Sequence, residues 1–200
     1  MSTGLVNIEN NKIKNLNRFA ELAKLNEVVF HADDLANLWQ ITNKNTLYTT
    51  LKRYTAQGLL YRIYKGFYAI KEVAKIDSLL LGVKALHGSA YVSTETVLAD
   101  AGIILQAVPA ITLVSGLSKK FTIGDHLYLS RQLGDSFRYH SVGITTSVNG
   151  VRKAGVERAV ADMMYFNPKA YFDGESLIDW TAVKNMQEEI GYPLTPQRYG

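Results

Sequence analysis

One stretch of 37 residues, from Leu35 through Lys71, contains no Asp or Glu and yet carries six cationic side chains. Its hydrophobic pattern predicts a helix, a turn and a second helix, followed by two short aromatic runs around Lys65 and Gly66. The cations are Lys44, Lys52, Arg53, Arg62, Lys65 and Lys71. A surface of one charge sign and of this shape suits a phosphate backbone.

The positive charge of the chain is confined to its first third. The 200 residues carry a formal net charge of +4. Residues 1–72 hold 10 Lys and Arg against 6 Asp and Glu, whereas residues 73–200 hold 12 of each. The excess that gives a pI of about 9.1 therefore belongs to the N-terminal region alone.

Composition places the chain among compact globular proteins. Hydrophobic residues make up 47%, which is ample for one large domain or two small ones. The chain has no Cys, so disulfides, thiolate metal sites and cysteine nucleophiles are excluded, and a reducing compartment fits. The four His residues lack metal-ligand spacing, and we expect no cofactor and no metal. They are His31, His87, His126 and His140.

Two segments bear on localisation. Met1–Lys14 is polar and lacks the apolar stretch of a secretory signal, so we expect a cytoplasmic protein. Ala101–Ser118 is uncharged and approaches the length of a membrane span. Polar residues and Pro109 interrupt it, which favours a loop over Gln106–Pro109 and a buried strand over Ala110–Ser115. We therefore expect no membrane association.

The N-terminal region has the element order of a winged helix-turn-helix. We expect helices over Lys14–Leu25, from Ala32 onwards and over Thr46–Gln57, an extended run over Val28–Phe30, and a hairpin over Leu59–Ile70. Asn43–Asn45 is expected to form the turn, with Thr46 as the N-cap of the third helix and Gly58 just past its end. Residues 1–72 are thus predicted to form one domain.

The third helix is expected to bury one face and expose a cationic one. Leu51 and Tyr54 fall within about 40° of Leu47 on a helical wheel, whereas Lys52 and Arg53 lie on the opposite side. In a winged helix the third helix enters the major groove and the wing follows the backbone. The candidate DNA-binding residues are Lys44, Asn45, Thr46, Tyr48, Thr49, Lys52 and Arg53 of the helix region, and Arg62, Tyr64 and Lys65 of the wing.

Two alternative interpretations of this region stay open. The Lys and Arg side chains can simply solvate an exposed helix, and some winged helices bind protein instead of nucleic acid. The hairpin aromatics are better explained by packing than by base stacking, because two of the four face the core in any hairpin. These aromatics are Tyr61, Tyr64, Phe67 and Tyr68.

After a hinge at Lys71–Lys75, residues 76–200 are predicted to form an α+β domain with a mostly antiparallel sheet. Ser93 is expected to cap a helix over Thr94–Ala101. The expected strands are Ala90–Val92, Ala110–Ser115, Lys120–Ile123, His126–Leu133, Ser136–His140, Ile144–Val148 and Val151–Ala154. The other expected helices are Ile76–Leu86, Val156–Phe166 and Ile178–Ile190.

This second region carries little catalytic chemistry. It has no phosphate loop, nucleophile elbow or paired Cys. Glu157 and Asp162 permit the alternative of a metal-dependent nuclease, but Arg158 and Asp162 are four residues apart, the ordinary spacing of a surface ion pair. His126 and His140 are expected to be hydrogen-bonded sheet residues. We expect no catalytic residues and a protein that is not an enzyme.

Three stretches carry motifs in a fairly specific order and spacing. The first is Leu47–Gly66, with Gly58-Leu59-Leu60 before the wing. The second runs from Tyr91-Val92-Ser93 through Leu98-Ala99 to Gly102, and the third is Ala154–Asp162 with Glu157-Arg158-Ala159. Together they resemble the AbiE-type antitoxin family, whose members are transcriptional regulators of bacterial type IV toxin-antitoxin and abortive-infection systems for phage defence. One departure is Tyr54, where the family frequently has Leu.

The resemblance implies an N-terminal winged helix that binds inverted repeats of double-stranded DNA in its own promoter, as a monomer or dimer. It further implies a C-terminal domain that counters a toxin similar to nucleotidyltransferases. The chain is accordingly expected to be an autorepressor and an antitoxin. The alternative is a stand-alone winged-helix regulator, or a protein-interaction adaptor, without a toxin partner.

Overall fold

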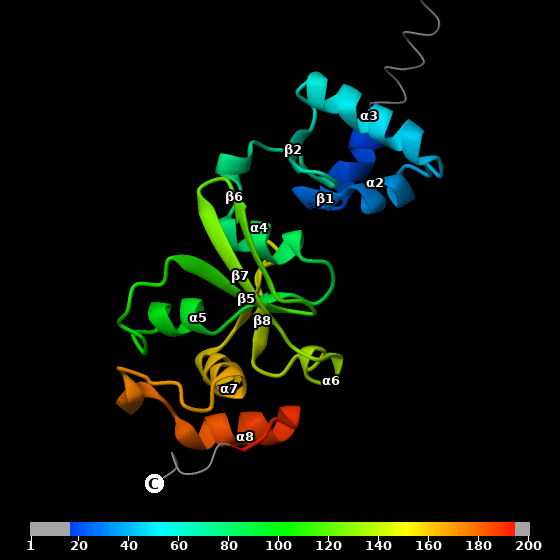
Figure 1. The fold of residues 1–200 in the computed structure, drawn as a ribbon. Helices are drawn as coiled ribbons and strands as arrows, with labels where there is room; N and C mark the ends of the chain where they lie inside the picture. Colours follow the sequence, from blue (N-terminus) through cyan, green and yellow to red (C-terminus); the bar gives the residue numbers. More distant parts are fainter. Residues whose placement is uncertain (1–16, 195–200) are drawn as a thin grey trace, which may run out of the picture. The chain divides into compact units, whose positions relative to one another are not determined.

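The structure is a computed structural model that describes residues 17–194. It divides the chain into two compact units, residues 1–76 and 77–200. Figure 1 shows the helices and strands of both units. The polar stretch Met1–Lys14 and the start of the expected first helix lie outside the described residues, and residues 17–24 are helical.

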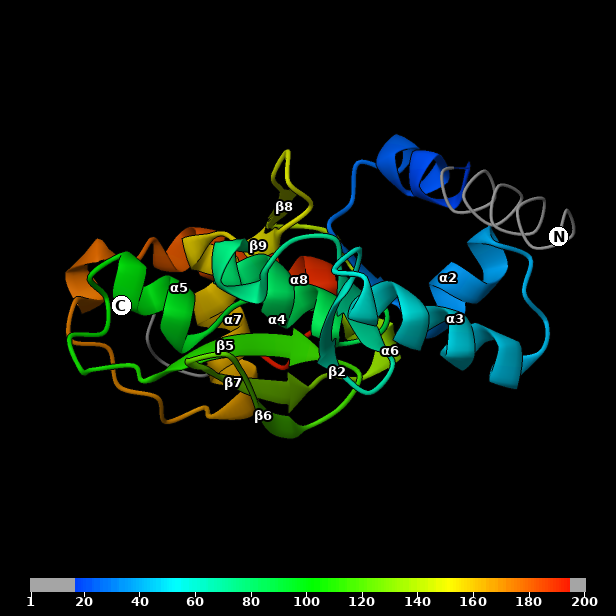
Figure 2. The same ribbon diagram turned by 90° about the horizontal axis from the view of Figure 1, so that it is seen from above.

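The first unit combines helices with a small sheet (Figures 1 and 2). Its elements after the helical residues 17–24 are β1 (Val29–His31), α2 (Ala32–Leu38), α3 (Lys44–Ala56), β2 (Tyr61–Tyr64), β3 (Phe67–Ala69) and the 3-10 turn η1 (Val73–Lys75). The strands form an antiparallel sheet in the order β1-β3-β2. Lys65 and Gly66 form the turn between β2 and β3, where the φ of +84° at Gly66 suits glycine.

The predicted apolar face of α3 is confirmed. Leu47, Leu51 and Tyr54 are at most 3% exposed. The ring of Trp39, which follows α2, meets the Tyr54 ring edge-on, with 5.6 Å between the ring centres. The centre of the Phe19 ring lies 5.2 Å from that of Tyr54. Burial of these side chains fixes the rotation of α3 about its own axis. The residues between them, Lys52 and Arg53, must therefore face outward, and both are exposed.

The start of α3 differs from the expectation. The side chain of Asn43, and not that of Thr46, caps the helix: Asn43 Oδ1 accepts a hydrogen bond from the Thr46 backbone N–H at 3.1 Å. The expected turn residues Lys44 and Asn45 are consequently the first two residues of the helix. Asn and Thr are both good N-caps, so the run Thr42-Asn43-Lys44-Asn45-Thr46 offers several competing starts.

The second unit holds a six-stranded sheet in the order β6-β7-β5-β4-β9-β8. Its strands are β4 (Tyr91–Val92), β5 (Ala110–Ser115), β6 (Lys119–Ile123), β7 (His126–Gln132), β8 (Ile144–Thr146) and β9 (Arg152–Ala154). Its helices are α4 (Ser78–Ala85), α5 (Glu95–Asp100), α6 (Asp135–Arg138), α7 (Val156–Phe166), η2 (Glu175–Leu177) and α8 (Trp180–Ile190). The α+β class is thereby confirmed, as is the strand expected over Ala110–Ser115.

The six-stranded sheet is mixed with antiparallel pairs in the majority, which agrees with the expectation of a mostly antiparallel sheet. In the described residues, three of its neighbouring pairs are antiparallel, and two, β5 with β7 and β4 with β9, are parallel. The parallel pairing of β5 with β7 follows from the β6–β7 hairpin. β7 returns between β6 and β5, so it runs in the same direction as β5.

Different helices cover the two faces of this sheet. Leu113 of β5 and Tyr128 of β7 face α4, where a Cβ on Gly82 would lie only 2.5 Å from the Tyr128 ring. The neighbouring Thr112 points to the other face, where it exchanges hydrogen bonds with Thr96 of α5. α7 packs on β9. α8 packs on α7, as Figure 1 also shows.

Two other expectations for this unit are wrong. Ser136–His140 is not a strand, because Asp135–Arg138 forms the short helix α6. Ser93 does not cap α5, because its hydroxyl donates to Asp162 Oδ2 at 2.7 Å and Thr94 occupies the N-cap position. Asp162, 69 residues further along the chain, thus binds the hydroxyl that the preference of Ser for N-cap positions assigns to the start of α5.

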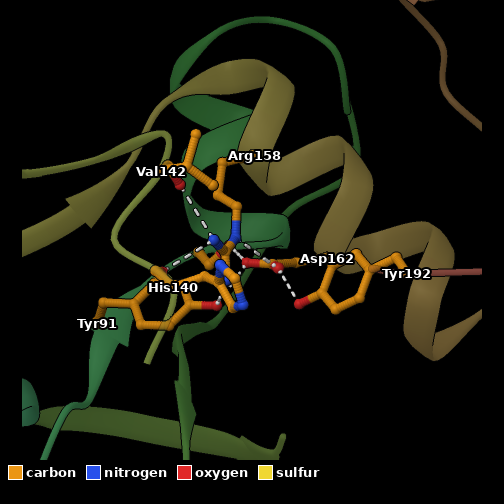
Figure 3. Close-up of polar contacts among 7 residues, drawn as sticks. Tyr91, His140, Val142, Arg158, Asp162 and Tyr192 are labelled. Carbon is orange, nitrogen blue, oxygen red and sulfur yellow. Dashed lines mark hydrogen bonds and ion pairs between the residues drawn. The ribbon is translucent and has the colours of Figure 1, made fainter. Parts of the chain in front are cut away.

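A buried ion pair joins the distant parts of the second unit (Figure 3). Arg158 Nε donates to Asp162 Oδ1 at 2.9 Å, and both side chains are fully buried. Arg158 Nη1 donates to the backbone carbonyls of His140 and Val142, at 3.2 and 3.0 Å. Its Nη2 donates to the Tyr91 hydroxyl at 2.8 Å. The guanidinium therefore ties α7 to β4 and to the segment between α6 and β8.

The carboxylate of Asp162 accepts hydrogen bonds on both oxygens. Oδ1 also accepts from the Tyr192 hydroxyl at 2.7 Å, and Oδ2 accepts from Tyr91 at 3.0 Å and from Ser93. Burial and the nearby Asp162 raise the pKa of the Tyr91 and Tyr192 hydroxyls, which keeps both phenols protonated as donors. The expectation that Arg158 and Asp162 form a surface ion pair is wrong.

No helix among residues 17–194 is both long and apolar enough to cross a membrane.

We predict that Asp162→Asn lowers the free energy of unfolding by about 3–5 kcal/mol, because it leaves a buried guanidinium without its counter-charge. Chemical denaturation followed by circular dichroism measures the change. A loss below about 1 kcal/mol, the size of a surface effect, contradicts the role given to this pair.

The matched control is Glu188→Gln. Glu188 pairs with Lys184 at the same spacing of four residues, at 3.9 Å, but both side chains are about half exposed. Solvent screens such a pair, so we expect a change of no more than about 0.5 kcal/mol.

Candidate functional site

A groove of about 500 Å³ lies between α3 and the β2–β3 hairpin. We call it the cationic groove. Lys52 reaches it from α3, Arg62 from β2, and Lys65 from the turn of the hairpin. Its remaining walls are formed by Tyr48, Thr55 and Tyr68. Two parts of the chain that are separate in sequence thus direct three cations to one hollow.

Among residues 17–194, no Asp or Glu lines this groove. In the part of the chain that the structure describes, Lys52, Arg62 and Lys65 form no ion pair with Asp or Glu, and all three are exposed. Three neighbouring cations without counter-charges repel one another and raise the local positive potential. All three side chains are exposed, so solvent screens this repulsion, and an anion bound in the groove would reduce it further.

Tyrosine hydroxyls add hydrogen-bond donors beside the cations. Burial is the main cause that raises the pKa of Tyr68, with Arg62 acting in the opposite direction and Tyr48 in the same one. The Tyr68 hydroxyl therefore stays protonated at neutral pH. Tyr48 is 43% exposed, so its ring is available to a ligand as well as to the groove.

Four of the predicted interface residues line the cationic groove, and six do not. Those that line it are Tyr48, Lys52, Arg62 and Lys65. Lys44, Asn45, Thr46 and Thr49 are exposed on the N-terminal half of α3, outside the groove. Arg53 is exposed and lies over the Tyr54 ring, with its guanidinium carbon 5.3 Å from the ring centre. Tyr64 packs against Phe67 at 5.1 Å, and burial raises its pKa.

Two residues that line the groove were not predicted from the sequence. Thr55 and Tyr68 have no charge, and Tyr68 was assigned to hairpin packing, with which its 5% exposure agrees. The spacing of Tyr48, Lys52 and Thr55 held a signal, because residues four and three apart share one side of a helix. Tyr68 lies opposite Arg62 in the β2–β3 register because the register shifts between Arg62 and Tyr64, whereas regular pairing across the two-residue turn would place Ala69 opposite Arg62.

The other candidates do not come together as a site. Asp162 is buried in the network of Figure 3, and Glu157 lies at the first turn of α7. His126 and His140 are exposed, His126 at the start of β7 and His140 after α6, so the expectation of a sheet position fits only His126. Among residues 17–194, no group of three or more His, Asp or Glu is placed to hold a metal ion.

The N-cap of α3 is needed to hold the first turn of the helix, which carries Lys44, Asn45 and Thr46. We predict that Asn43→Ala lowers the free energy of unfolding by about 1 kcal/mol, because it removes the acceptor of the Thr46 N–H. Asn43→Asp, which keeps an acceptor and adds a negative charge at the helix start, should restore the stability. Thermal unfolding of the three proteins measures both effects, and equal stabilities contradict the assignment of the cap.

No protein-family model matches this chain, and no curated protein matches it.

Proposed function

We propose that residues 1–72 form a winged helix-turn-helix that binds double-stranded DNA, and that the chain is a transcriptional regulator that acts on its own promoter. The observation that carries this proposal is the cationic groove, in which Lys52, Arg62 and Lys65 meet without a carboxylate. A backbone phosphate supplies the negative charge that these three side chains lack.

The position of the groove allows α3 and the hairpin to contact different parts of the DNA. α3 is 13 residues long and exposes Asn45, Thr46 and Thr49 near its N-terminal end. A major groove about 12 Å wide admits one helix, and short polar side chains at its start can reach base edges. The cations of the hairpin then lie where the wing meets the backbone, so phosphate contacts fix the register while α3 contacts bases.

The antitoxin role rests on the resemblance of Leu47–Gly66, of the stretch from Tyr91 to Gly102, and of Ala154–Asp162 to the AbiE-type family. We propose on that basis that residues 77–200 counter a toxin similar to nucleotidyltransferases. Within Ala154–Asp162, Arg158 and Asp162 hold α7 to β4, so this stretch has a structural part in the unit to which the antitoxin role is assigned.

The geometry disfavours the alternative of a nuclease that uses Glu157 and Asp162. Each oxygen of Asp162 already accepts two hydrogen bonds, and the carboxylate is fully buried beside the Arg158 guanidinium. A carboxylate in that environment has no free oxygen to offer a metal ion. Asp162 is therefore assigned to the core of the unit.

The cationic groove is tested by removing its charges. We predict that Lys52→Ala combined with Arg62→Ala weakens binding to the chain's own upstream DNA by at least about ten-fold in a mobility shift at fixed salt, because two phosphate contacts are lost. The loss should be similar on unrelated DNA, since phosphate contacts carry no sequence information. Unchanged affinity would remove the proposal.

A matched control is Lys184→Ala combined with Arg152→Ala, which makes the same change of net charge in the second unit. Lys184 is about half exposed on α8, and Arg152 belongs to β9. DNA affinity should change by less than about two-fold, because these side chains lie in the unit to which we assign no DNA contacts. An equal loss in both double variants would point to net charge alone.

A further inference from the structure

The side chain of Tyr68 belongs both to the core of the first unit and to the cationic groove. Tyr68 is 5% exposed and is part of the same buried cluster as Leu51 and Tyr54 of α3. It also lines the groove, together with Lys52 and Arg62. A tyrosine with its ring packed in a core has its polar end left for contact with a ligand.

The hydroxyl of Tyr68 is unpaired, unlike those of the other buried tyrosines. The hydroxyls of Tyr54, Tyr91, Tyr128 and Tyr192 all have hydrogen-bond partners. That of Tyr68 has none among residues 17–194, and it is not one of the fully buried unpaired atoms of that range, so it is open to solvent at the groove. The protein thus brings a donor to the groove that it does not use itself.

The cations of the groove lie close to this hydroxyl. Arg62 is the partner of Tyr68 on the neighbouring strand, and Lys52 reaches the same groove from α3. Burial raises the pKa of Tyr68, and the nearby Arg62 cation opposes that rise. An anion attracted by the two cations is therefore within reach of a neutral hydrogen-bond donor.

We propose that the Tyr68 hydroxyl donates a hydrogen bond to a phosphate oxygen of the DNA backbone that Lys52 and Arg62 attract, and that it thereby fixes the position of this phosphate. The inference rests on the DNA binding proposed above and adds a contact of a different kind. A phosphate oxygen suits the position, because it carries negative charge for the cations and accepts hydrogen bonds from neutral donors.

Tyr68 differs from the cations in charge and in freedom of movement. An O–H···O hydrogen bond requires a distance of about 2.5–3.0 Å, whereas the attraction of a cation decreases slowly with distance. Lys52 and Arg62 are exposed and long, so they can follow a displaced phosphate, but the buried ring of Tyr68 cannot. Tyr68 therefore contributes only when the phosphate is in register.

Tyr68→Phe tests the contact, because it removes the hydroxyl and keeps the ring. We expect binding to the chain's own upstream DNA to become about ten-fold weaker at fixed salt, the loss that corresponds to one hydrogen bond to a charged group. The logarithmic dependence of affinity on salt should keep its slope, because a neutral hydroxyl releases no counterion, whereas Arg62→Ala should reduce the slope by about 0.9. Fluorescence anisotropy at several salt concentrations measures both quantities.

Unrelated DNA separates a contact in register from general attraction. On such DNA the loss caused by Tyr68→Phe should be less than about two-fold, because the phosphate is not held at hydrogen-bonding distance. The loss caused by Arg62→Ala should be similar on both DNAs.

Tyr61→Phe is the matched control. Tyr61 precedes Arg62 on β2 but does not line the groove, so loss of its hydroxyl should change DNA affinity by less than about two-fold. Tyr68→Phe should melt at the temperature of the unsubstituted protein, because its hydroxyl has no internal hydrogen bond to lose.

Three results would overturn the proposal. Unchanged affinity of Tyr68→Phe for the upstream DNA leaves Tyr68 a packing residue only, an equal loss on both DNAs removes its role in register, and a reduced salt slope shows that the substitution acts through the cations. In each case the unsubstituted protein still binds DNA in a salt-dependent manner. Failure of the proposed DNA binding itself is a different result, the absence of such binding.

Discussion

The burial of one face of α3 sets the properties of the first unit. Tyr54 packs against Phe19 and Trp39, and Leu47 and Leu51 extend the same buried stripe. With that face fixed, Tyr48, Lys52 and Thr55 are turned towards the hairpin, where Arg62 and Lys65 meet them. The hydrophobic core thus gathers positive charge, because the buried face of α3 turns Lys52 outward, and among residues 17–194 no Asp or Glu lines the groove.

The second unit is organised by a polar interaction instead. Arg158 and Asp162 connect α7 to β4, to the segment before β8 and to Tyr192 after α8. A fully buried pair adds little net stability over an apolar pair of similar volume, but the loss of either partner is costly. Its effect is therefore to specify one arrangement of these elements. The same network holds Ser93, the residue before Thr94, whose φ of +54° is rare for a β-branched residue.

Much of the fold followed from local pattern. The period of apolar residues predicted α7 over Val156–Phe166 and the strand Ala110–Ser115 with the bounds that the structure has. Residue alternation misled at Ser136–His140, where Phe137 and Tyr139 suggested a strand. Asp135 follows Gly134 directly and begins α6, whose Arg138 is buried. A four-residue helix is too short for its period to be read from sequence.

The residues around Arg158 and Asp162 indicated that the pair is buried, although its spacing of four residues is also that of a surface ion pair. The pair occurs among Ala159, Val160, Ala161, Met163 and Met164, so α7 has no wide polar face on which a surface ion pair could lie. A helix that is apolar nearly all round is buried, and charged residues within it must find partners. Those partners, Tyr91 and Tyr192, are distant in sequence, and no local rule predicts them.

Candidate sites were harder to predict than elements, because they combine segments whose distance only the fold sets. The charge pattern indicated Lys52, Arg62 and Lys65, but not that Arg53 lies over Tyr54, outside the groove. Nothing in the sequence marked the contact of Glu95 with Arg131, because it depends on how α5 lies on the sheet. Properties of this kind depend on the tertiary structure, so the sequence alone does not predict them.

The dependence of DNA affinity on salt tests the central claim most directly, because it counts the phosphate charges that the protein neutralises. We expect the affinity of the unsubstituted protein for its upstream DNA to fall by about 10³ or more between 50 and 200 mM salt, given about six phosphate contacts in the complex. The triple substitution of Lys52, Arg62 and Lys65 by Ala should reduce the logarithmic slope by about 2.7, or about 0.9 for each lost contact. A slope that is flat, or that is unchanged by the triple substitution, would contradict the account.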